Sequence, residues 1–176
     1  DFADTTRPDA PEDAAILERA RAGVEALNIK FGADHADRFF LFHRPRRWNP
    51  AERRWMGYER KRGKLADLNL LLRGGGADSF SLIVGDIATL GGTRYVITLD
   101  TDTQLARDSA WQFVGAMAHP LNRARYDEGK QRVVAGYGIL QPRVGVSLTS
   151  AYRSRFAAIH SGHPGVDPYT TAVSDV

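Results

Sequence analysis

The chain has 176 residues, of which 43% are hydrophobic and 26% charged, a composition typical of a globular protein with a sizeable core. It contains no cysteine, which excludes disulfides and thiolate metal sites. No apolar stretch approaches the roughly 18 residues that a membrane-spanning helix requires. Because the chain opens at Asp1 without a methionine, we expect it to be a fragment of a longer protein.

The net charge of +3 is unevenly distributed. Residues 38–64 contain ten Lys or Arg residues and only two Glu, a local balance of +8. Such a block favours an anionic partner such as phosphate, nucleic acid or lipid headgroups. A solvated helix face is the alternative interpretation.

The chain opens with an acidic segment, residues 1–5. It is interpreted as the end of a strand, in which Asp1 or Asp4 accepts hydrogen bonds from a base or a ribose, or as a frayed polar terminus. Residues 8–28 follow with apolar positions near a period of 3.6, which predicts an amphipathic helix.

Residues 38–43 predict a short aromatic strand. The loop that follows places three arginines around Trp48, an arrangement suited to an anion or a sugar ring, whereas His43 is interpreted as structural or exposed. Asn49 and Pro50 are helix-start signals and predict a helix from there to about Arg73, either continuous or interrupted at Gly57 or Gly63. Within it, Lys61 followed by Gly63 can offer an ammonium and free N–H groups to a phosphate, but the full P-loop pattern is absent.

After three glycines, residues 79–90 predict a strand or a hairpin arm. Residues 94–99 are apolar and rich in β-branched side chains, and predict a buried strand. The strand ends in Asp100, Thr101 and Asp102. Two carboxylates spaced i, i+2 at the carboxyl end of a strand form an oxygen-rich site suited to Mg²⁺ or Mn²⁺, which commonly clamps a diphosphate.

The last part of the chain predicts a helix over residues 107–117, a polar loop over 122–131 and a strand over 133–140. Gln141 and Pro142 come directly after this strand. An edge strand over 144–148 and a short basic helix over 152–160 are also expected.

Three other functions remain open at this point. A haloacid-dehalogenase-type phosphatase uses strand-DxDx[TV], but here Gln104 occupies the fifth position and the motif lies in the middle of the chain. A metal hydrolase built on the histidines lacks HxxxH and HxH pairings. A polyanion- or nucleic-acid-binding module would use the basic block 38–64, in which aromatic residues alternate with cations, but would leave Asp100 and Asp102 unexplained.

Several long runs resemble the glycosyltransferase region of cyclic β-1,2-glucan synthases, and they are far more specific than a DxD motif. They are residues 40–49, 55–65, 97–104, 117–122, 126–130 and 136–143. The resemblance covers nearly the whole chain. It implies an α/β, GT-A-like, Rossmann-type core with a mostly parallel sheet flanked by helices, truncated at both ends, so that residues 1–176 form one donor-binding domain fragment.

The resemblance to this cellulose-synthase-like group also implies residue roles. Asp100 and Asp102 match the metal-binding pair, and Lys61 matches the lysine of a KxGxLN segment that contacts the nucleotide diphosphate. Asn69 is displaced from the usual place of that segment. Gln141 falls where the group lines the acceptor side, and Asp1 and Asp4 are the remaining candidates for nucleotide-sugar binding.

The implied reaction transfers glucose from UDP-glucose to the 2-hydroxyl of a growing β-glucan, with inversion. The general base is expected downstream of this chain, so the fragment is expected to have little or no activity. Membrane attachment through absent flanking segments, at the cytoplasmic face of the bacterial inner membrane, is also implied. No nucleic acid partner is expected under this interpretation.

Overall fold

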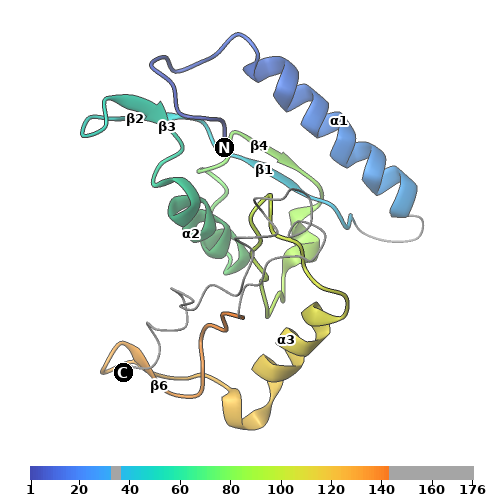
Figure 1. Cartoon of the computed structure of the whole chain (residues 1–176), viewed down its shortest axis with the longest axis vertical. Coiled ribbons are helices and arrows are strands. Elements are labelled where there is room, and N and C mark those ends of the chain that lie inside the picture. Colours follow the sequence, from blue (N-terminus) through green and yellow to red (C-terminus); the bar gives the residue numbers. More distant parts are fainter. Residues whose placement is uncertain (33–36, 143–176) are drawn as a thin grey trace, which may run out of the picture. The chain divides into compact units, whose positions relative to one another are not determined.

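The computed structural model describes residues 1–32 and 37–142 (Figure 1). The chain forms two compact units, residues 1–96 and residues 97–176. The expected edge strand over 144–148 and helix over 152–160 lie outside the described residues.

The first unit begins with the helix α1, Asp13–Phe31, which confirms the expected helix with a start and an end a few residues later. Its Asn28 ties the helix to the chain that follows. The Asn28 side-chain amide donates to the carbonyl of Phe39 (2.8 Å), and its oxygen accepts from the backbone N–H groups of Arg38 (3.1 Å) and Phe39 (2.9 Å). This contact positions strand β1, Leu41–His43, beside the helix.

Strand β1 pairs antiparallel with β4, Leu82–Val84, with Phe42 opposite Ile83. The expected strand over 79–90 is therefore shorter than predicted, because Gly85 adopts a φ of +104° and the 3-10 helix η1, Ile87–Leu90, follows. A Cβ on Gly85 would lie 2.5 Å from the Phe40 ring, so this close approach of backbone and ring requires glycine.

A second antiparallel pair replaces the first turns of the expected helix over 50–73. Strands β2, Arg47–Asn49, and β3, Arg54–Met56, form a hairpin with Trp48 opposite Trp55. The predicted helix does not start at Asn49, because a hairpin forms there instead. Asn49 nevertheless accepts hydrogen bonds from the backbone N–H groups that follow it, as the residue at a helix start would. The Asn49 side-chain oxygen accepts from the backbone N–H groups of Ala51 (3.0 Å) and Glu52 (3.3 Å), which closes the hairpin turn.

The helical part of this region is α2, Arg60–Leu72. Glu59 and Arg60, at its start, both have positive φ angles of 50° and 48°. The chain therefore reverses sharply between the end of β3 and the start of α2.

The second unit contains the helix α3, Ser109–Ala118, close to the expected range of 107–117. The 3-10 helix η2, Pro120–Asn122, follows. Strands β5, Arg125–Asp127, and β6, Arg132–Ala135, then form a hairpin. β5 lies where a polar loop was expected, whereas β6 is a shorter form of the strand expected over 133–140. The Asp127 carboxylate accepts from the backbone N–H of Lys130 (2.9 Å), which stabilises its turn.

The sheet topology corrects the expected fold. The described residues form three two-stranded antiparallel sheets with three α-helices, an α/β arrangement, and contain no parallel Rossmann-type sheet. Among residues 1–32 and 37–142, the expected strand over 94–99 is not formed as part of a sheet. Its apolar side chains are accordingly exposed, from 40% for Tyr95 to 48% for Leu99.

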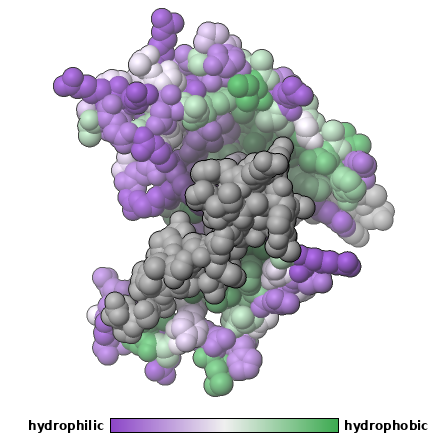
Figure 2. All heavy atoms as spheres, in the orientation of Figure 1, coloured by the Kyte–Doolittle hydropathy of each residue, from purple (hydrophilic) through white to green (hydrophobic). Residues whose placement is uncertain are grey.

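The buried centre of the first unit mixes apolar and polar side chains. Met56 and Val84 are the buried hydrophobic residues of the described part, and His43 and Arg44 are buried beside them. Figure 2 shows hydrophilic residues gathered over the side of this unit that carries the β2–β3 hairpin. Among the described residues, no helix has both the length and the apolar character needed to cross a membrane.

Candidate functional site

Three of the residues predicted to bind the nucleotide sugar line one small pocket in the first unit. Asp1, Asp4 and Lys61 surround a volume of about 130 Å³ together with Phe2, Gly57, Arg60 and Lys64. We call this the α2 pocket. The N-terminal segment and the start of α2, which lie more than 50 positions apart in the sequence, are thus brought together.

Two backbone hydrogen bonds hold the N-terminal segment against the hairpin. The Thr5 N–H donates to the Trp55 carbonyl (2.9 Å), and the Trp55 N–H donates to the Thr5 carbonyl (2.8 Å). The acidic segment is therefore not frayed: it forms an antiparallel bridge with β3.

Arg44 fixes the beginning of this segment. Its guanidinium is nearly fully buried, and it donates from Nε to Asp1 Oδ1 (3.0 Å) and from Nη2 to Asp1 Oδ2 (2.6 Å). Nη1 donates to Asp67 on α2 (2.7 Å), and Nη2 also donates to the carbonyl of Arg60 (3.1 Å). One side chain thus ties the N-terminal segment to both the start and the middle of α2.

Two glycines allow the close packing around the α2 pocket. A Cβ on Gly57 would lie 2.5 Å from the Asp1 carboxylate. A Cβ on Gly63 would overlap the carbonyl oxygen of Tyr58 and lie 3.0 Å from Arg44 Nη1. Steric contacts therefore explain why position 63, in the Lys61–Gly63 pattern, is a glycine.

The start of α2 is well suited to an anion. The Glu59 side chain makes no capping hydrogen bond to the helix, and the positive end of the helix dipole lies beside Lys61 and Lys64 of the pocket. Opposing this, Asp4 accepts from Arg60 Nη2 (2.9 Å) and Nε (3.2 Å). The pocket therefore carries cations on the α2 side and carboxylates on the N-terminal side.

The other predicted site residues belong to the second unit. Asp100 and Asp102 lie in an exposed turn in which the Thr103 N–H donates to the Asp100 carbonyl (3.1 Å). Gln141 is exposed in an irregular segment after β6. Lys61 therefore belongs to one unit, and these three residues belong to the other.

The carboxylates of this turn have the chemistry of a partial metal site. The described residues hold no cluster of three or more His, Asp or Glu side chains that could coordinate a metal. Two carboxylates nevertheless fit Mg²⁺ or Mn²⁺, because such ions are commonly bound by one or two carboxylates together with substrate phosphates.

Two of the arginines near Trp48 that were expected to surround an anion, Arg44 and Arg46, form ion pairs with carboxylates instead. Arg46 forms an ion pair with Asp13 of α1, and its guanidinium lies 5.0 Å from the centroid of the Phe2 ring. Because Asp13 lies 33 positions from Arg46, and Asp1 lies 43 positions from Arg44, no local pattern in the sequence indicated these pairs. Arg47, by contrast, is exposed.

His43 is a buried structural residue. Its Nδ1 lies 3.0 Å from Ser81 Oγ, its Nε2 has no hydrogen-bond partner among the described residues, and its ring lies 4.5 Å from the Phe2 ring. Burial lowers the pKa of His43, and the nearby Arg46 acts in the same direction. Its environment therefore favours the neutral form of the ring.

No protein-family model matches the chain. A curated protein does: over 177 aligned positions, and over 100% of this chain, the sequence is 46% identical to "Cyclic beta-(1,2)-glucan synthase NdvB" of Rhizobium meliloti (strain 1021). The chain spans only 6% of the length of that protein. This chain is therefore homologous to a segment of a cyclic beta-(1,2)-glucan synthase, which confirms the resemblance seen in its motifs.

Proposed function

We propose that this chain binds the nucleotide-sugar donor in an inverting glucosyltransferase that builds cyclic β-1,2-glucan from UDP-glucose. The observation that carries the proposal is the 46% identity to a cyclic beta-(1,2)-glucan synthase over the whole chain. It is supported by the α2 pocket, since Asp1, Asp4 and Lys61 line a single cavity.

In this proposal the diphosphate of the donor binds at the start of α2. Lys61 and Lys64 supply ammonium groups at the pocket, and the positive end of the α2 dipole lies beside them. Charge-assisted hydrogen bonds of this kind favour a phosphate strongly, and they also stabilise the charge that develops on a leaving diphosphate.

The carboxylates on the other side of the pocket suit the nucleoside. Asp4 and Asp1 each retain acceptor capacity beyond their bonds to arginine, because a carboxylate offers about four acceptor positions. A ribose hydroxyl or the uracil N–H can donate to these positions.

Asp100 and Asp102 would hold Mg²⁺ or Mn²⁺, and the ion would neutralise phosphate charge when bound. Gln141 would contribute to the acceptor side, where the growing β-glucan binds. We assign no general base within residues 1–32 and 37–142, so the proposal concerns donor binding and not turnover. Attachment to the cytoplasmic face of the bacterial inner membrane belongs to the whole synthase in this proposal.

Calorimetric titration of UDP, with and without Mn²⁺, tests the proposal. We expect metal-dependent affinity that is lost in Asp102→Asn and reduced about tenfold or more in Lys61→Ala, the cost of a charge-assisted hydrogen bond. Asp108→Asn is the matched control for the carboxylate, because Asp108 is exposed in the same unit and its φ of 63° suits asparagine. Lys130→Ala removes the same charge as Lys61→Ala from an exposed turn.

Two outcomes contradict the proposal. One is UDP affinity that is equal with and without Mn²⁺ and equal in Asp102→Asn and Asp108→Asn. The other is salt-sensitive binding of any polyanion, indifferent to Mn²⁺, which would favour a polyanion-binding module built on residues 38–64.

A further inference from the structure

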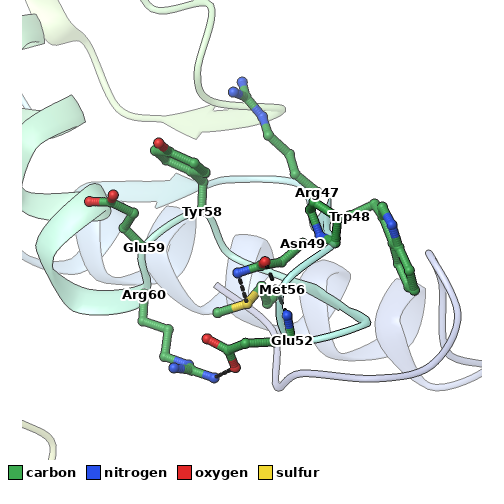
Figure 3. Close-up of a pocket in the computed structure, with 9 residues that line it drawn as sticks. Arg47, Trp48, Asn49, Glu52, Met56, Tyr58, Glu59 and Arg60 are labelled. Carbon is green, nitrogen blue, oxygen red and sulfur yellow. Dashed lines mark hydrogen bonds and ion pairs between the residues drawn. The ribbon is translucent and has the colours of Figure 1, made fainter.

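A second and larger pocket lies on the β2–β3 hairpin, next to the α2 pocket (Figure 3). Its volume is about 380 Å³, within the range of roughly 300–1,000 Å³ that is usual for small-molecule sites. The side chains that carry the argument below are Arg47, Asn49, Glu52, Met56, Tyr58 and Arg60. We call this the hairpin pocket.

The charges that line the hairpin pocket are balanced. Arg60 Nη2 donates to Glu52 (2.5 Å), and Glu59 forms an ion pair with Arg62 of α2. With two arginines and two glutamates in its wall, neither sign dominates. A phosphate gains little from such a wall, in contrast to the α2 pocket, where Lys61 and Lys64 gather.

The same groups are well suited to hydroxyls. Guanidinium, carboxylate and amide groups are planar and offer paired donors or acceptors, which match neighbouring hydroxyl groups of a sugar ring. Arg47 and Tyr58 project from the same side of the pocket in Figure 3, and Glu52 and Arg60 lie opposite. Donors and acceptors are therefore both present in the lining of the pocket.

An aromatic surface accompanies these polar groups. Tyr58 is 58% exposed at the pocket, although its ring is large and apolar. Aromatic rings combine an extended apolar face with a polar edge, and the C–H face of a pyranose covers such a ring well. Met56 also belongs to the lining, where its side chain is almost fully buried.

The pocket is held in shape without a ligand. Asn49 accepts from two backbone N–H groups of the hairpin turn and donates to Met56 Sδ (3.4 Å), so its amide is fixed. Glu59 and Arg60, which line this pocket, have φ angles of 50° and 48°, a conformation that non-glycine residues rarely adopt. Such backbone strain concentrates at ligand sites.

We propose that the hairpin pocket binds glucose units of a β-linked glucan chain, at a site separate from the donor's diphosphate. The pocket's balanced charge and exposed aromatic ring favour a neutral, hydroxyl-rich ligand over a nucleotide or a nucleic acid. The identity of the sugar rests on the proposed function, whereas the pocket itself does not.

The test is a titration of the whole chain with linear β-1,2-gluco-oligosaccharides, followed by ¹⁵N–¹H NMR. We expect shifts of the backbone amides of the hairpin and of Tyr58, and about tenfold weaker binding in Tyr58→Ala. The matched control is Tyr126→Ala, because Tyr126 is also 58% exposed but lies on β5. Arg47→Gln should also weaken binding, and Arg54→Gln, on the same hairpin but outside the pocket lining, should not.

The inference is overturned if millimolar glucan produces no shifts at the hairpin, or if Tyr58→Ala and Tyr126→Ala behave alike. It is also overturned if a sulfated polysaccharide binds there and the neutral glucan does not. Near-ultraviolet circular dichroism of each variant shows whether the fold is retained.

Failure of this inference and failure of the proposed function are distinguishable. Glucan binding should persist in Asp102→Asn and without Mn²⁺, and UDP binding should persist in Tyr58→Ala. Glucan affinity without UDP affinity would remove the donor proposal alone, and UDP affinity without glucan affinity would remove the hairpin pocket alone.

Discussion

Arg44 holds Asp1 with two hydrogen bonds, from Nε to Oδ1 at 3.0 Å and from Nη2 to Oδ2 at 2.6 Å. The same guanidinium donates to Asp67 at 2.7 Å, so two carboxylates neutralise one nearly buried cation. The position of the N-terminal segment in the α2 pocket depends on this arrangement.

Replacing Arg44 should therefore be costly. We expect Arg44→Met to lower the free energy of unfolding of the first unit by about 3–5 kcal/mol, because it leaves Asp1 and Asp67 without their buried cation. Urea unfolding monitored by tryptophan fluorescence measures the change. Arg62→Met is the control: Arg62 is 79% exposed beside Glu59, and loss of an exposed ion pair costs less than about 1 kcal/mol. Equal losses of unfolding free energy in the two variants would show that Arg44 contributes no more to stability than an exposed ion pair does.

The packing around Gly63 can be tested by comparing alanine substitutions at Gly63 and at Gly23, since a Cβ on Gly23 would meet no other atom within 4 Å. Gly63→Ala should lower the free energy of unfolding by about 1–3 kcal/mol, because its Cβ would collide with the Tyr58 carbonyl. Gly23→Ala, within α1, meets nothing within 4 Å and should raise it by about 0.4–1 kcal/mol. Thermal unfolding of both variants checks the opposite signs. Two changes of the same sign would contradict the packing described around Gly63.

His43 should make stability depend on pH. Burial lowers the pKa of His43 in the folded chain, Arg46 lowers it further, and Asp13 opposes them. The unfolded chain therefore binds more protons as pH falls below about 6.5, the ordinary value for histidine. The free energy of unfolding should thus be largest above that pH and fall from there toward the lowered pKa.

Urea midpoints at several pH values between about 5 and 8 measure this dependence. The dependence should be reduced in His43→Gln and retained in His119→Gln, since His119 is exposed. A midpoint that rises on acidification would mean that His43 gains a proton on folding, contrary to its environment.

The ion pair of Asp13 with Arg46 makes a separate prediction. The hydrogen bond from Arg46 holds the pKa of the Asp13 carboxyl below its ordinary value, and the carboxylate form contributes stability that is lost as pH falls through that lowered pKa. Titration by carboxyl ¹³C NMR should show the Asp13 pKa rising in Arg46→Met. It should stay unchanged in Arg47→Met, because Arg47 does not contact Asp13. A rise in both variants would point to a general field effect instead of a specific bond.

The sequence predicted what depends on local pattern. The periodicity of α1 and of α3 is visible within each helix, so both were found to within a few residues. The signal at Asn49 was also informative, because its side-chain oxygen accepts from the backbone N–H groups of Ala51 and Glu52, two and three positions along the chain.

What the sequence did not predict depends on partners far along the chain. A helix start and a hairpin turn use the same residues at Asn49 and Pro50, and the choice between them is made by pairing of Trp48 with Trp55 and of Trp55 with Thr5. Similarly, the apolar residues 94–99 have strand composition, but a strand also requires a neighbour to pair with. The composition of residues 94–99 does not indicate which segment of the chain would pair with them.

Arg60 lines both pockets of the first unit and contacts a carboxylate of each, Asp4 in the α2 pocket and Glu52 in the hairpin pocket. A ligand that draws Glu52 away from this guanidinium strengthens its hold on Asp4, and a ligand that occupies Asp4 has the converse effect. Binding free energies that share a component in this way are linked, and the linkage is reciprocal. If both pockets bind the ligands proposed above, we therefore expect occupancy of one to change the affinity of the other by the same factor, with Arg60 as the coupling side chain.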